Sequence, residues 1–144
     1  MPVEIAEVRR RLRAAIEKAR RAAEERRVRT DAAGRDYQLF LEQRATPVFQ
    51  QVAGALKAEN YSFKVFTPAS SIRLASDRSP EEFIELALDE TSDPPAVLGR
   101  TSRGRGRRMT ATERVVGEGR ALADLTEEDV LTFLLEEITA LLER

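Results

Sequence analysis

The residue types that carry most enzyme chemistry are missing from this 144-residue chain. It contains no histidine and no cysteine, which removes the usual general base near neutral pH, the commonest metal ligand and all thiolate chemistry. Lysine occurs only at Lys18, Lys57 and Lys64, and arginine stays protonated at neutral pH. Catalysis would therefore depend on carboxylates, hydroxyls or these lysines. We expect a protein that is not an enzyme, with no catalytic residues, no cofactor and no metal.

The sharpest cluster of one residue type is a run of arginines between residues 100 and 108. Gly104 and Gly106 lie inside this run and predict the tip of a hairpin. Guanidinium groups suit phosphate oxygens, and a basic two-stranded ribbon fits the major groove of DNA. The candidate residues for binding nucleic acid or another anion are Arg100, Arg103, Arg105, Arg107 and Arg108. In the alternative interpretation they pair with acidic residues across the sheet, such as Glu81, Glu82, Asp89 and Glu90.

Other charged residues form blocks of alternating sign along the chain. Residues 1–35 hold 11 Lys/Arg against 6 Asp/Glu, although the net charge of the whole chain is −1. Glutamates interrupt the first block, so we favour the solvated flank of a coiled coil over a nucleic-acid-binding arm. The alternation indicates charge complementarity within the molecule or between subunits, or else a basic surface for an anionic partner. For Glu85 and Asp89, pairing with arginine is favoured over chelation of a cation.

Residues 1–59 are predicted to form a helical arm or hairpin with coiled-coil character. Apolar and small residues recur there at three- and four-residue spacing. The resulting seam is narrow and rich in alanine, so this helix needs a partner. Gly34 and Thr46-Pro47 are possible breaks; we favour two antiparallel helices, with one long kinked helix through residue 58 as the alternative. The residues expected to mediate self-association are Ile5, Val8, Leu12, Ala15 and Ala19.

Residues 60–144 are predicted to form an antiparallel sheet with a helix packed on it. Alternating apolar and polar side chains predict strands near residues 61–65, 72–74, 96–103 and 107–116. Segment 80–90 also alternates, but Ser79-Pro80 ahead of it resembles the start of a helix. We favour a strand there and keep a helix as the alternative. We expect an antiparallel meander of about four strands.

The C-terminal helix has the clearest signals in the chain. Thr126 is a suitable N-cap, and three acidic residues follow it, where the helix dipole favours negative charge. Leu125 and Val130 have the spacing of a hydrophobic staple. The apolar face that runs to Leu142 has to cover a sheet or another helix. The fold class is therefore α+β, with an N-terminal helical arm or hairpin, a four-stranded antiparallel meander and a C-terminal amphipathic helix packed on the sheet.

Together these features favour a non-enzymatic protein–protein interaction or assembly module that self-associates through its N-terminal helices. The expected partner is a second copy, with a dimer favoured, or another protein. Binding of nucleic acid or another polyanion through the arginine-rich hairpin 100–108 is the alternative. Since no stretch resembles a signal peptide or a membrane span, we expect a cytoplasmic protein with no membrane partner. The preference for arginine over lysine is typical of a GC-rich bacterial source.

Overall fold

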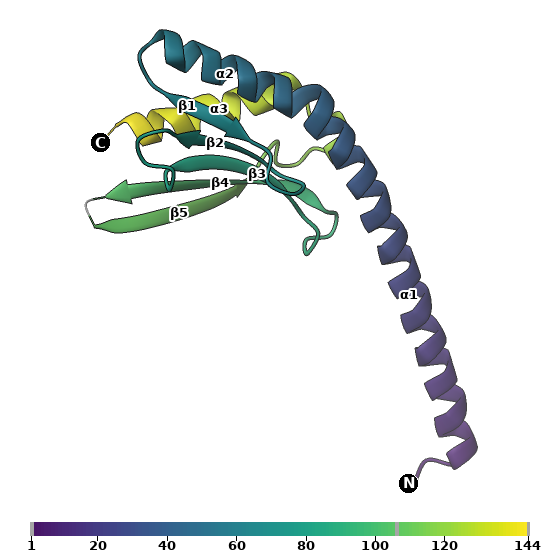
Figure 1. Ribbon diagram of the computed structural model, residues 1–144. Helices are drawn as coiled ribbons and strands as arrows, with labels where there is room; N and C mark the ends of the chain where they lie inside the picture. The colour runs from purple at the N-terminus through teal and green to yellow at the C-terminus, as the bar shows by residue number, and fades with distance from the viewer. Residues whose placement is uncertain (1, 106, 144) are drawn as a thin grey trace.

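A computed structural model describes residues 2–105 and 107–143 of the chain. It contains a long N-terminal helix, an antiparallel sheet and a C-terminal helix (Figure 1), which confirms the predicted α+β class. In chain order the elements are α1 (Ile5–Phe40), a π-helical turn η1 (Leu41–Ala45), α2 (Thr46–Ala58), β1 (Phe63–Phe66), β2 (Ile72–Ser76), β3 (Phe83–Asp89), β4 (Ala96–Arg105), β5 (Arg108–Val115), a 3₁₀ turn η2 (Leu122–Asp124) and α3 (Glu127–Leu142). None of the helices in the described ranges combines the length and the apolar character that crossing a membrane requires.

The N-terminal helix runs without a break from α1 through η1 into α2. The favoured pair of antiparallel helices is therefore wrong, and the alternative of one long kinked helix is confirmed. Pro47 cannot donate a backbone hydrogen bond. The helix continues past this residue because a π-helical turn precedes it, in which the Thr46 N–H donates to the carbonyl of Leu41. A stripe of buried side chains continues on both sides of the proline, from Tyr37 to Leu56. Burial of this stripe favours the continuous helix over a turn.

The sheet is a meander of five antiparallel strands in the order β1-β2-β3-β4-β5. The prediction of about four strands is corrected to five. Segment 83–89 is a strand, as favoured, because Ile84 and Leu86 alternate onto the buried face. Ser79 does not cap a helix; its carbonyl instead accepts a hydrogen bond from the Glu82 N–H in a turn.

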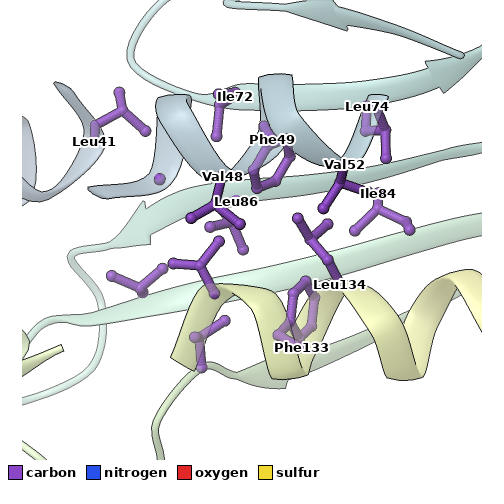
Figure 2. Packing of buried hydrophobic residues seen from close by; sticks show 14 of the residues in the cluster. Leu41, Val48, Phe49, Val52, Ile72, Leu74, Ile84, Leu86, Phe133 and Leu134 are labelled. Atoms are coloured by element: carbon purple, nitrogen blue, oxygen red, sulfur yellow. The ribbon is translucent and has the colours of Figure 1, made fainter. Parts of the chain in front are cut away.

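Helices α2 and α3 cover one face of this sheet. Figure 2 shows Phe49 of α2 and Leu134 of α3 pointing into the same cluster as Leu74 and Ile84 of the sheet. The fit of α3 depends on Gly99 in β4, because a Cβ atom built there would lie 2.2 Å from the ring of Phe133. The predicted packing of the C-terminal helix on the sheet is confirmed.

The start of α3 follows the sequence prediction residue by residue. Thr126 is the N-cap, and its side chain accepts from the Asp129 N–H while the Asp129 carboxylate accepts from the Thr126 N–H. Leu125 and Val130, the predicted staple, are both buried. The carbonyl of Leu125 also accepts a hydrogen bond from Arg44 of η1, so the first turn of α3 lies beside the start of α2.

Candidate interaction surfaces

The first part of α1, which we call the arm and define as residues 5–29, extends away from the sheet and the other helices (Figure 1). Every residue from 8 to 29 is exposed. The arm also exposes large apolar side chains of a kind that a globular protein normally buries. The exposed fractions are 72% for Ile5, 49% for Val8, 56% for Leu12 and 41% for Ile16.

The predicted self-association residues all lie on the arm, and all are exposed. Helical spacing places them along one side of α1, where they form a continuous apolar seam. Ile16 completes the seam and was missed, although it lies four residues after Leu12 and one helical turn before Ala19. Its spacing was the signal that could have identified it.

Charged side chains flank the seam, and only some of them are paired. Arg10 and Arg11 pair with Glu7 on the same helix. In contrast, the arginines on one side of the seam form no ion pair with any described residue. This unpaired set is named the basic flank and consists of Arg9, Arg13 and Arg20. The whole arm holds 10 Lys/Arg against 4 Asp/Glu, so it is strongly basic.

Contacts at the last residue of the arm and just beyond it hold the helix against the sheet and its loops. Arg29 pairs with Asp93 at 3.2 Å, and the buried Tyr37 hydroxyl donates to the carbonyl of Ser70 at 2.7 Å and also lies 3.4 Å from that of Leu86. Burial, and to a smaller extent the negative charge of Glu85, raise the pKa of Tyr37 above its usual value. These contacts set the direction in which the arm leaves the sheet and the covering helices.

A groove of about 460 Å³ lies between α2 and α3. Its floor is apolar, with contributions from Val52, Leu56, Leu131 and Ile138, and Leu135 at its side is 52% exposed. Three of its lining residues are glutamates that form no ion pair within the described ranges. We call them the acidic rim: Glu59, Glu127 and Glu128. Since all the lining residues belong to α2, the residue that follows it, and α3, the groove opens away from the sheet.

The arginine-rich hairpin does not gather its arginines on one surface. Arg100 and Arg103 are three residues apart in β4, so they point to opposite faces of the sheet. Arg103 donates to the carbonyl of Ala140 at 3.3 Å, near the end of α3, where a cation also suits the helix dipole. Arg107 and Arg108 are exposed at the tip. The side chain of Arg105 and the whole of Gly106 lie outside the described residues.

The strand register places acidic neighbours around Arg100. It lies opposite Glu85 in β3 and opposite Glu113 in β5. Glu85 itself pairs with Arg73 at 3.0 Å, as favoured over chelation of a cation. Asp89 accepts instead from Thr91, and that hydrogen bonding lowers its pKa. In the ranges the structure describes, no three acidic side chains come together in a way that could hold a metal ion.

No protein-family model, curated protein or solved structure matches the chain. The features of the molecule that bear on its function are therefore the arm, the groove and the hairpin.

Proposed function

We propose that the protein is a non-enzymatic interaction or assembly module that self-associates through its N-terminal arm, with a dimer as the expected state. The observation that supports this proposal is the exposed apolar seam on a helix whose other half is anchored in the core. Burying the seam side chains against a second copy would contribute on the order of 1 kcal/mol for each of the large ones. The seam side chains gain none of this free energy while they stay exposed to water.

The shape of the arm supports the same function. Helix formation is cooperative, because its first turn is costly to form. Here α1 continues directly into the buried stripe that begins at Tyr37, so the core supplies the nucleus and the arm extends it. A preformed helix loses less conformational entropy on binding than a disordered segment, which favours association.

Binding of a polyanion by the hairpin has weaker support. Arg103 is engaged with α3, and Arg100 lies between two glutamates in the strand register. Among the side chains that the structure describes at the tip, Arg107 and Arg108 are exposed. With Arg100 and Arg103 placed in this way, the hairpin offers a polyanion a less concentrated set of arginines than the sequence suggests.

Size-exclusion chromatography with light scattering tests the proposal. The wild-type chain should be a dimer at tens of micromolar, and Val8→Glu combined with Leu12→Glu should be a monomer, because both changes place a charge in the seam. Leu39→Glu is the matched control: Leu39 is a similarly exposed leucine on the same helix but outside the arm. The control should stay dimeric. A monomeric wild-type chain at this concentration would remove the proposal.

A further inference from the structure

We propose that the arm of one copy docks in the groove between α2 and α3 of a second copy, and that the exchange is reciprocal. This inference rests on self-association through the arm and goes further, because it names the surface that receives it. The groove is a concave apolar surface whose acidic rim forms no ion pair with any described residue. The arm is a convex apolar seam whose basic flank likewise forms none. Shape, hydrophobicity and charge are therefore complementary.

The two surfaces also have similar lengths. At 1.5 Å per residue, the seam from Ile5 to Ala19 spans about 21 Å. The groove extends along α2 from Val48 to Glu59, or about 16 Å on the same measure. Helices α2 and α3 run in the same direction beside it, since Arg44 contacts the start of α3 and Tyr61 lines a second pocket together with Leu141. A single helix can therefore lie along the groove and contact both of its walls.

Charge argues against the simplest alternative, in which two arms pair with each other. Each arm has 10 Lys/Arg against 4 Asp/Glu, so arm-to-arm pairing brings together two strongly basic helices, which repel. Docking in the groove instead places the basic flank near the acidic rim, and attraction of this kind also selects the correct partner surface. The small area offered by Ala15 and Ala19 lets a helix approach the groove closely.

The arm cannot fill the groove of its own protomer. It belongs to the same unbroken helix as α2, which forms one wall of the groove, and it extends away from that wall (Figure 1). The occupant therefore comes from a second chain. Each copy offers one arm and one groove, and a reciprocal exchange uses all four surfaces in a closed twofold dimer.

Reversal of charge separates the two modes of pairing. Changing the acidic rim by Glu59→Arg, Glu127→Arg and Glu128→Arg should weaken dimerisation at least about tenfold, because each exposed ion pair contributes modestly and three are reversed together. Arm-to-arm pairing predicts that this variant dimerises like the wild type, and that result would overturn docking in the groove while leaving self-association intact. A monomeric wild-type chain would instead remove both.

Reversal of the basic flank by Arg9→Glu, Arg13→Glu and Arg20→Glu completes the test. Alone it should also weaken the dimer, whereas arm-to-arm pairing predicts a tighter one because the repulsion is relieved. Combined in one chain with the reversed rim, it should restore dimerisation, since the charges match again. Loss of dimer in the combined chain, with an unchanged circular dichroism spectrum, would refute the pairing of these two surfaces.

Disulfide trapping gives a second measurement, and it does not require the substitutions at Glu127 and Glu128 in the first turn of α3. The chain has no cysteine, so a mixture of Leu12→Cys and Leu135→Cys chains has no background thiols. Both positions are exposed, and an equilibrium redox buffer should yield mainly the mixed disulfide. Gln50→Cys, on the exposed side of α2 outside the groove, is the matched control and should crosslink poorly with Leu12→Cys. A predominance of Leu12–Leu12 crosslinks would overturn the proposal.

Discussion

Gly99 is the position at which a single methyl group should do most damage to the packing of α3 on the sheet. In Gly99→Ala the new Cβ would lie 2.2 Å from Cζ and 2.5 Å from Cε2 of Phe133. The ring is 2% exposed and has little room to move. Overpacking of this kind costs about 1–3 kcal/mol, and the lower flexibility of alanine in the unfolded chain offsets about 0.5–1 kcal/mol.

With the middle value of each range, the net loss should be about 1 kcal/mol in the free energy of unfolding, measured by urea denaturation at one fixed protein concentration. Gly54→Ala is the matched control, because Gly54 is an exposed residue inside α2 and a Cβ atom there meets nothing within 4 Å. Alanine is the better helix former, so this control should gain about 0.5–1 kcal/mol. The two substitutions should therefore change the free energy of unfolding in opposite directions.

A double-mutant cycle identifies Phe133 as the cause. Phe133→Leu alone should lose stability through a smaller apolar side chain and through loss of the contact with the Arg114 guanidinium, which lies 4.7 Å from the ring centre. When Gly99→Ala is added to Phe133→Leu, the smaller side chain leaves space for the methyl group. The double variant should therefore lose about 1 kcal/mol less unfolding free energy than the sum of the losses in the two single variants. Additive losses, or a Gly99→Ala chain as stable as the wild type, would refute this account of the packing.

Two further predictions concern groups that fix the helices. Tyr37→Phe should lose about 1 kcal/mol of stability at neutral pH, because it removes the hydrogen bond to Ser70. Burial raises the pKa of Tyr37 in the folded state, so the wild-type chain should also lose stability as the pH rises above the usual tyrosine pKa of 10.0. This loss should be steeper in the wild type than in the variant. Equal slopes in urea titrations across that pH range would contradict this. Thr126→Ala should lose about 1 kcal/mol of stability, because it removes the N-cap side chain that accepts from the Asp129 N–H. Thermal melts followed by circular dichroism measure this loss. An unchanged melting temperature would mean that the capping box does not stabilise α3.

Signals carried by neighbouring residues made the C-terminal helix and the strands predictable. The N-cap, the acidic first turn and the staple of α3 all lie within six residues, from Leu125 to Val130. The alternation in segment 83–89 reflects burial of one face, which is why it outweighed the helix-like start at Ser79. Such patterns need no knowledge of distant contacts.

The errors arose where distant contacts decide the structure. Thr46-Pro47 predicts a boundary because proline cannot donate its backbone amide and is favoured at the first position of a helix, where Thr46 would be the N-cap. Thr46 is nevertheless helical, with φ −60° and ψ −47°, since burial of the stripe on both sides outweighs the local preference. The groove likewise could not be predicted, because its walls are α2 and α3, more than sixty residues apart in the sequence. The strand period alone is enough to predict that Arg100 and Arg103 lie on opposite faces of the sheet.

The unbroken helix also determines where the arm can be buried. A loop at Gly34 would have let the first helix fold back toward the groove of its own chain. With Gly34 inside α1 and the hydroxyl of Tyr37 bonded to Ser70, the direction of the arm is set by the core. An apolar seam held in this way gains burial only from another molecule. Inserting a flexible glycine-rich loop at residue 34 should therefore allow the seam to reach its own groove and convert the proposed dimer into a monomer. A dimer that persists would show that the direction of the arm does not control association.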